Sequence, residues 1–367
     1  MKKLKVIISG GGTGGHIFPA LSIANELKAR VPGVDILFVG ALGRMEMERV
    51  PAAGYPIVGL PVMGLPRKAS LKMFRFLWML YKSMQKARRL INDFQPDVAV
   101  GVGGYASGPV LKAAVRKGVP AVLQEQNSYA GVTNKLLASK VRKICVAYPN
   151  MERYFPAGKI VLTGNPVRQN LLQSVDKQDA LTEFGLVAGK PVVLIVGGSL
   201  GARSLNEAVL INLDLIAQSG VQVLWQTGKI YYSEIMERVQ GRLPDNLKPL
   251  EFLSNMDLAY KAADLVISRA GAGTISELCL LGKPSVLVPS PNVAEDHQTK
   301  NALALVENDA AVLVKDAEAG DRLFQEAFAL VNDEERLAQL AANCLKMAKP
   351  TATTDIVNVI LNETENK

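Results

Sequence analysis

The sequence predicts an α/β protein of two Rossmann-like domains, each built on a parallel sheet. Short apolar runs alternate with helical stretches throughout, the pattern of βαβ units. A glycine turn after the first apolar run, residues 11–15, reappears in the second half as residues 197–201. The 367 residues, 49% of them hydrophobic, suit two domains of about 150 to 200 residues better than one core.

The expected elements follow in order. In the first half the apolar runs that predict strands are residues 6–8, 36–39, 98–100 and 121–123, and in the second half they are residues 192–196, 221–225, 265–267 and 285–288. A glycine and a proline within residues 163–168 mark the join, so we expect domains over 1–166 and 167–349. Pro350 interrupts the helical pattern, and residues 350–367 are expected to form a helix that packs back on the N-terminal domain.

Charge is divided unevenly between the halves. Residues 1–166 hold 24 Lys and Arg against 8 Asp and Glu, whereas the remainder holds 18 against 26. A basic first half indicates an anionic surface, either nucleic acid or phospholipid, with plain solubility as the alternative. The three cysteines, Cys145, Cys279 and Cys344, show no disulfide or zinc spacing, which fits a reducing cytoplasm. No apolar run is long enough to span a bilayer.

Four glycine turns follow predicted strands. They are residues 10–15, 103–109, 197–201 and 270–274. Such turns let the amides at a helix start approach a ligand, and two per domain suit a cleft lined by strand ends. The alternative is that some only let helices pack closely on strands. A nicotinamide site is disfavoured because the second strand ends in Gly40-Ala41-Leu42, without an acid for the ribose.

Four polar residues stand out near these turns. His16 follows the first turn, where a helix start favours a neutral ring that can accept a proton. His297 is interpreted as a binding residue. Glu277, expected in the first turn of its helix, could cap that helix or accept hydrogen bonds from a ribose. Arg168, at the domain join, could counter a diphosphate or pin the hinge.

Several motifs together carry a resemblance to one family. They are Gly11-Gly12-Thr13-Gly14-Gly15-His16, Gly103-Gly104-Tyr105-Ala106-Ser107-Gly108-Pro109, Glu125-Gln126-Asn127, Gly164-Asn165-Pro166-Val167-Arg168, Gly197-Gly198-Ser199-Leu200-Gly201-Ala202 and the run 268–302. In these motifs the chain is similar to the MurG family of bacterial peptidoglycan glycosyltransferases. The matching blocks span residues 6 to about 302, and their combination is specific although each glycine turn alone is not.

The resemblance implies a GT-B architecture, with two Rossmann-like domains facing each other across a deep cleft. It implies inverting transfer of GlcNAc from UDP-GlcNAc to the 4-hydroxyl of MurNAc in lipid I (undecaprenyl-pyrophosphoryl-MurNAc-pentapeptide), forming lipid II. It also implies a peripheral enzyme on the cytoplasmic side of the bacterial inner membrane, with other cell-wall synthesis proteins as partners and neither nucleic acid nor cofactor. Because no Asp-x-Asp pair follows a strand, no metal site is expected.

The same resemblance assigns residues to the substrates. Most of the UDP-GlcNAc contacts fall in the second domain: Ser199 and Arg168 at the diphosphate, Phe252 and Leu253 at the uracil, Ala272, Gly273 and Thr274 at the nucleotide, Glu277 at the ribose, and His297 and Gln298 at the sugar. The first domain would add Thr13, Gly14, Gly15, His16 and Asn127, with Thr13, His16 and Tyr105 on the acceptor side. For the chemistry, His16 is the expected base and Glu125 the alternative, while helix starts and Arg168 would stabilise the leaving diphosphate.

A predicted helix over residues 71–91 accounts for the basic first half. Its helical wheel places one apolar stripe that we expect to face the core: Met73, Leu77, Leu80, Met84 and Ile91. The opposite side carries a basic and aromatic stripe: Leu71, Phe74, Arg75, Trp78, Lys82, Lys86 and Arg89. Large apolar groups among cations favour docking on anionic lipid, although an aromatic side chain could also pack under a loop.

Two rival functions remain open at this stage. A UDP-GlcNAc 2-epimerase would use the same scaffold and sugar nucleotide without a membrane. A nucleic-acid or membrane binding module without catalysis would explain the charge, but it would leave the glycine turns and the two histidines without a role.

Overall fold

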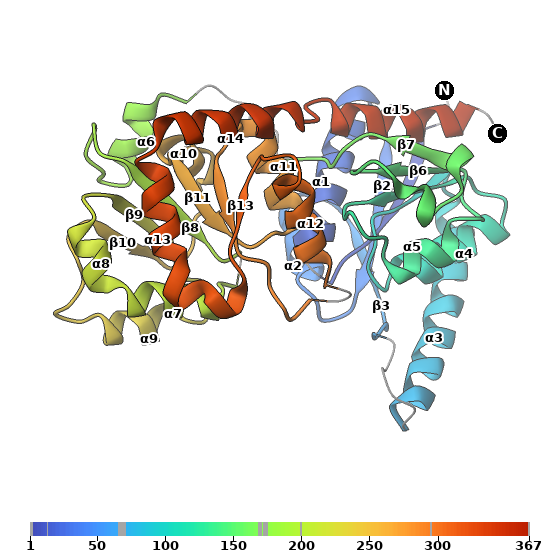
Figure 1. Ribbon diagram of the computed structural model, residues 1–367. Helices are drawn as coiled ribbons and strands as arrows, with labels where there is room; N and C mark the ends of the chain where they lie inside the picture. The colour runs from blue at the N-terminus through green and yellow to red at the C-terminus, as the bar shows by residue number, and fades with distance from the viewer. Residues whose placement is uncertain are drawn as a thin grey trace. The chain divides into compact units, whose positions relative to one another are not determined.

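The computed structural model describes residues 3–12, 14–64, 71–167, 171, 175–198, 200–293 and 296–365. The chain divides into two compact units. Unit 1 consists of Met1–Val167 together with Lys349–Lys367, and unit 2 of Arg168–Ala348. Each unit holds one parallel sheet flanked by helices (Figure 1).

The unit 1 sheet has seven strands in the order β3-β2-β1-β4-β5-β6-β7. Side chains of β1 alternate between two cores: Ile7 joins the cluster on one face of the sheet, whereas Val6 and Ile8 join the cluster on the other. All three are fully buried, as expected for a parallel strand covered on both faces. The strands are β1 (Lys5–Ser9), β2 (Asp35–Ala41), β3 (Ile57–Leu60), β4 (Val98–Gly101), β5 (Ala121–Glu125), β6 (Lys143–Val146) and β7 (Ile160–Leu162).

Helices cover both faces of this sheet. The last of them, α15, packs beside α1, and its residues Ile356, Val357 and Ile360 join the core that contains Val6 and Ile8. The final helix of the chain is thus part of unit 1. The helices of unit 1 are α1 (Gly14–Arg30), α2 (Glu46–Ala52), α3 (Leu71–Phe94), α4 (Ser107–Arg116), α5 (Val132–Leu137) and α15 (Ala352–Glu365).

The unit 2 sheet repeats this topology. Its order is β10-β9-β8-β11-β12-β13, which matches the first six positions of the unit 1 sheet when strands are counted from the start of each unit. The strands are β8 (Val192–Val196), β9 (Gln222–Gln226), β10 (Leu247–Leu250), β11 (Leu265–Ser268), β12 (Ser285–Leu287) and β13 (Val312–Leu313). The helices are α6 (Lys177–Glu183), α7 (Arg203–Ile211), α8 (Leu213–Gln218), α9 (Tyr232–Arg238), α10 (Met256–Ala262), α11 (Ala272–Leu281), α12 (His297–Val306), α13 (Ala319–Val331) and α14 (Glu334–Lys346).

The fold prediction is confirmed in its main features. Each of the eight predicted strands is present within two residues of its expected bounds. The strands that were not predicted, β3, β6, β7, β10 and β13, are short; four of them are edge strands, and β6 lies next to an edge strand. Among the described residues, no helix is both long and apolar enough to cross a bilayer.

Candidate active site

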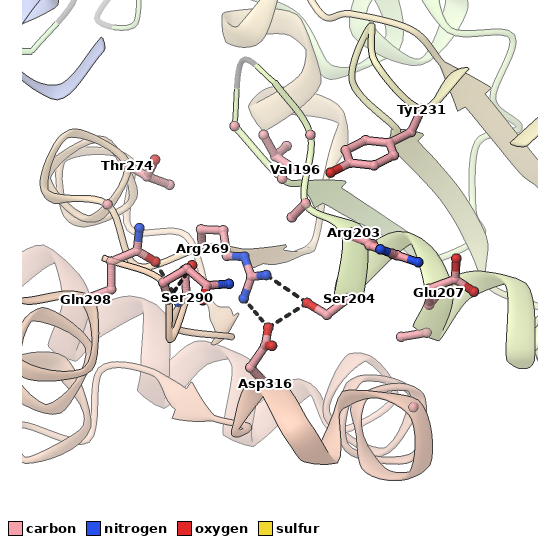
Figure 2. A pocket seen from close by; sticks show the side chains of 18 of the residues that line it. Val196, Arg203, Ser204, Glu207, Tyr231, Arg269, Thr274, Ser290, Gln298 and Asp316 are labelled. Carbon is pink, nitrogen blue, oxygen red and sulfur yellow. Dashed lines mark hydrogen bonds and ion pairs between the residues drawn. The ribbon is translucent and has the colours of Figure 1, made fainter. Parts of the chain in front are cut away.

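A pocket of about 720 Å³ lies at the carboxyl edge of the unit 2 sheet. The turn after β8 forms one wall, and Thr274 and Gln298 lie on the opposite side (Figure 2). Gly201, in that turn, has a φ of +81°, and a Cβ there would overlap the carbonyl group of Thr227. Only glycine therefore lets this turn close. The carboxyl edge of a parallel sheet is where such folds bind ligands.

A fixed guanidinium group lies in the wall of this pocket. Arg269, directly after β11, donates to a carboxylate oxygen of Asp316 and to the hydroxyl of Ser204 (2.7 Å) (Figure 2). It also donates to the carbonyl oxygen of Val288 (3.0 Å). The side chains of Arg269 and Asp316 are only 14% and 22% exposed, so water screens this pair less than a surface pair. The pocket thus contains a cation whose position is set by three separate segments.

The start of α11 adds hydrogen-bond donors to the same edge. Gly271, the residue before the helix, makes no side-chain cap. The first-turn amides of Ala272, Gly273 and Thr274 therefore have no partner inside the helix, and they carry the positive end of its dipole. A Cβ on Gly273 would meet nothing within 4 Å, which shows open space beside this turn. This end of α11 can receive an anion or a hydroxyl group.

Glu277 lies in the second turn of α11, not in the first as expected. The prediction that it could cap its own helix is wrong, because a cap must reach the amides of the first turn. Its Oε2 instead accepts a hydrogen bond from the hydroxyl of Tyr260 (3.0 Å), a residue of α10 that is 2% exposed. Tyr260 therefore restricts the orientation of the Glu277 carboxylate.

The other residues expected at the nucleotide sugar differ in exposure. Leu253 is buried, whereas Phe252 is 41% exposed with the Lys229 ammonium 5.9 Å from its ring centre. Gln298 lines the pocket, and its Oε1 accepts from the backbone amide of Ser290 (2.9 Å), which leaves its NH2 as the end that can donate to a ligand. His297 is the first residue of α12 and is half-buried.

In unit 1 the first two glycine turns come together around His16. The ring Nδ1 lies 3.1 Å from the carbonyl oxygen of Gly11. A Cβ on Gly103 would lie 2.8 Å from the ring Nε2, and a Cβ on Gly104 would overlap the Gly11 carbonyl. Both glycines also have positive φ values, so this approach requires glycine twice. His16 is half-buried and is the third residue of α1, directly after Gly15.

Comparisons with known proteins show the family to which the chain is similar. Residues 6–146 match the glycosyltransferase family 28 N-terminal domain, and residues 192–356 match the C-terminal domain of that family. A relative in Parabacteroides distasonis, named UDP-N-acetylglucosamine--N-acetylmuramyl-(pentapeptide) pyrophosphoryl-undecaprenol N-acetylglucosamine transferase, is 56% identical over 368 residues, all of both chains. A relative of the same name in Porphyromonas gingivalis is 53% identical, over 100% of this chain and 97% of its own.

The crystal structure of Acinetobacter baumannii MurG matches with a TM-score of 0.77 and 30% identity, over 98% of this chain and 99% of its own. The chain belongs to the MurG glycosyltransferases. UDP-GlcNAc 2-epimerase from Neisseria meningitidis also matches, with a TM-score of 0.67 and 15% identity over 98% of this chain and 100% of its own. That likeness extends only to the fold.

The second carboxylate expected in the MurG site, Glu125, is already saturated with hydrogen bonds. It is 2% exposed, and its two oxygens accept from the backbone amides of Asn127 (3.1 Å) and Gly131 (3.0 Å) and from the side-chain amides of Asn127 (3.3 Å) and Asn134 (2.8 Å). These bonds hold the loop between β5 and α5, and they fix Asn127 in the process. Glu125 therefore organises this loop.

Tyr105, expected on the acceptor side, is 57% exposed after the β4 turn. Its hydroxyl lies close to Gly64, where an added Cβ would come within 2.8 Å of it. Gly14 and Gly15 form the first residues of α1. Three further residues of the expected MurG site, Thr13, Arg168 and Ser199, lie outside the described residues, as does the side chain of Leu71.

The helix expected to dock on lipid, α3, is exposed over most of its first half. Leu77 and Leu80, which we expected in the core, are 53% and 37% exposed, so that prediction is wrong. Among the side chains of α3 that the structure describes, the buried ones are Ser83, Ala87 and Ile91, because the second half of α3 packs against α4 and β3 (Figure 1). Phe74 and Trp78 are 75% and 57% exposed, Tyr81 is 56% exposed, and Arg75 and Lys82 are exposed as well. This part of α3 is a contiguous apolar and basic surface.

Proposed function

We propose that this chain transfers GlcNAc from UDP-GlcNAc to the 4-hydroxyl of MurNAc in undecaprenyl-pyrophosphoryl-MurNAc-pentapeptide, inverting the anomeric centre to form lipid II. The observation that carries this proposal is that the chain is more than 50% identical in sequence, over its full length, to relatives named for that transfer. The pocket at the carboxyl edge of the unit 2 sheet supports it, because its volume lies in the range of small-molecule sites.

We assign the donor nucleotide to unit 2. The start of α11 would meet the nucleotide with Ala272, Gly273 and Thr274, and Glu277 would accept hydrogen bonds from the ribose hydroxyls. Arg168 and Ser199 keep their assignment to the diphosphate. The Arg269 guanidinium, which is paired with Asp316, lies in the same pocket. Donors aimed at developing negative charge are commonly worth about 10²- to 10³-fold in rate each.

We assign the general base to His16. A carbonyl oxygen only accepts, so the contact of Nδ1 with the Gly11 carbonyl places the proton of the neutral ring on Nδ1. Nε2 is then the basic nitrogen. It would take the proton of the acceptor hydroxyl as the oxygen bonds to the anomeric carbon and the bond from that carbon to the UDP oxygen breaks. A base in this role contributes about 10²- to 10⁴-fold.

His16 is favoured over Glu125 because of their surroundings. Glu125 is 2% exposed and accepts four hydrogen bonds, three from its own loop and one from Asn134 of α5. Protonating it would break bonds that shape the loop, and a substrate hydroxyl would have to displace them. His16 is half-buried at the edge of a glycine turn, where close approach is sterically allowed.

We further propose that the first half of α3 docks on anionic lipid at the cytoplasmic side of the bacterial membrane, where a lipid-linked acceptor resides. Its exposed aromatic side chains and cations support this, since each cation near such a surface contributes about 1 kcal/mol. Contacts with other cell-wall synthesis proteins belong to the same proposal.

The decisive experiment measures UDP release from UDP-GlcNAc with and without a lipid I analogue. Release only with the analogue, together with a disaccharide product, supports the transferase. Conversion to the 2-epimer without any acceptor would instead establish an epimerase, and neither product from protein that binds the nucleotide would indicate a binding module.

A further inference from the structure

Glu46 is a buried carboxylate with no role in the mechanism described so far. It is the first residue of α2 and is 1% exposed. Its Oε1 accepts from the backbone amide of Ala41 (2.9 Å), and both carboxylate oxygens accept from the amide of Gly12 (3.1 and 3.0 Å). Burying a carboxylate costs free energy unless hydrogen bonds compensate it, and these three bonds do so.

The surrounding glycines leave room for this one side chain. A Cβ on Gly11 would overlap the Glu46 carboxylate, and a Cβ on Gly40 would lie 2.5 Å from its Cγ. Gly11 and Gly12 both have positive φ values, of +146° and +91°. The first glycine turn is thus wrapped around the Glu46 carboxyl group, and any side chain at Gly11 or Gly40 would displace it.

This turn leads directly to His16. Glu46 fixes the amide of Gly12, and the peptide bond that contains this amide also contains the carbonyl group of Gly11. Because the peptide unit is planar, holding its N–H also sets the direction of its C=O. That carbonyl oxygen is the one within 3.1 Å of His16 Nδ1. The orientation of Glu46 is therefore transmitted to the imidazole through a single rigid group.

We propose that Glu46 is a positioning residue for the base: by holding the Gly11–Gly12 peptide it keeps the proton of His16 on Nδ1 and Nε2 basic. The inference rests on the proposed role of His16. Glycine turns of this kind commonly offer their backbone amides to an anionic ligand. In this turn the amide of Gly12 is already bonded to the Glu46 carboxylate, which is consistent with a positioning role for Glu46.

The test compares Glu46→Gln with Glu48→Gln, which makes the same chemical change at an exposed position of the same helix. In Glu46→Gln one carboxylate oxygen becomes an NH2 group that faces backbone donors. The chain has two histidines, so long-range proton–nitrogen spectra of histidine-labelled protein resolve both rings, and His297→Ala assigns them. Kinetics of GlcNAc transfer and the unfolding temperature are measured on the same samples.

We expect His16 in the unmodified protein to hold its proton on Nδ1, and this fraction to fall in Glu46→Gln but not in Glu48→Gln. We expect kcat to fall about 10- to 100-fold, as for a misplaced reacting group, with KM for UDP-GlcNAc within about twofold. A folded Glu46→Gln protein with unchanged His16 signals overturns the proposal, whether or not kcat falls. If that variant does not fold, Glu46→Asp is measured by the same criteria, and unchanged signals there also overturn it.

Failure of this inference can be told from failure of the proposed base. Normal turnover in His16→Ala would reject the base and leave the tautomer result standing as a structural fact. Loss of turnover in His16→Ala with no change of tautomer in the Glu46 variants would keep the base and reject the positioning role.

Discussion

Replacing Phe74 and Trp78 together by serine should largely detach the protein from anionic membranes. These side chains are 75% and 57% exposed on the first half of α3, and the Lys82 ammonium lies 4.9 Å from the centre of the Trp78 ring. Trp78 also stacks on Tyr81, with 6.1 Å between ring centres. Their exposure means that the change removes contacts with lipid and few contacts within the protein.

The size of the effect follows from these exposures. Fully burying a large apolar side chain contributes about 1.5 to 3 kcal/mol, and roughly two thirds of each ring is available to lipid, so each contributes about 1 to 2 kcal/mol. The double change should therefore cost about 2 to 4 kcal/mol of membrane binding. At about 1.4 kcal/mol per factor of ten, the partition coefficient should fall between about 30-fold and several hundred-fold.

Sedimentation with vesicles that contain or lack anionic lipid measures this partition. The matched control replaces Val187 and Ile230 by serine, since they are exposed apolar residues of unit 2 at 57% and 65%. That control should sediment like the unmodified protein, and all three proteins should bind UDP equally. If the Phe74 and Trp78 change leaves the partition within about threefold, lipid docking by α3 is refuted.

Four further changes test the site and the fold. His16→Ala should lower kcat by about 10²- to 10⁴-fold while calorimetry finds UDP-GlcNAc affinity unchanged; a loss confined to affinity would reject the base. Tyr260→Phe, which removes only the hydroxyl that bonds Glu277, should weaken UDP binding by about 0.5 to 1.5 kcal/mol and leave the affinity for 2′,3′-dideoxy-UDP unaltered; equal losses for both ligands would contradict a ribose role. Ile360→Ala should cost about 2 to 5 kcal/mol of unfolding free energy in denaturant titration, because α15 buries this side chain in the unit 1 core, and a cost below about 1 kcal/mol would contradict that packing. Burial lowers the pKa of Lys283 from 10.5 to about 8, so between these values the unfolded chain binds the proton more tightly and stability rises with pH. Lys283→Met should remove that rise, and identical pH profiles for the two proteins would show that the lysine titrates normally.

The fold was predictable because its signals are local. A buried parallel strand such as β8 is a continuous apolar run, Val192–Val196, and a glycine turn directly after it marks the start of the next helix. Both signals occur within ten residues of sequence, and they recur in both units. The short edge strands lack them: β13 has two residues, both only partly buried.

Periodicity alone was less informative for α3. The helical wheel placed Ile91 in the core, where it is buried, but it also placed Leu77 and Leu80 there because an apolar stripe usually has a partner. Whether a neighbouring element reaches that stripe depends on helix length and on where α4 ends, which the wheel does not contain. The first half of α3 extends beyond α4 (Figure 1). Apolar residues of both stripes are therefore exposed there, among them Leu77 on one stripe and Trp78 on the other.

The sequence analysis did not identify Arg269 or Glu46, because their hydrogen-bond partners are distant along the chain. Arg269 bonds Asp316 and Ser204, which lie 47 and 65 residues away, and Glu46 bonds Gly12, 34 residues away. A glycine turn in the sequence predicts where the backbone bends. The side chain that fixes the turn after β1, Glu46, comes from another βα unit. In unit 1, then, a turn encoded locally is held by the Glu46 carboxylate from another part of the chain, and in unit 2 Arg269 links three segments that lie far apart in the sequence. Substitutions at these charged groups should alter turnover or ligand affinity without altering the elements that the local pattern specifies.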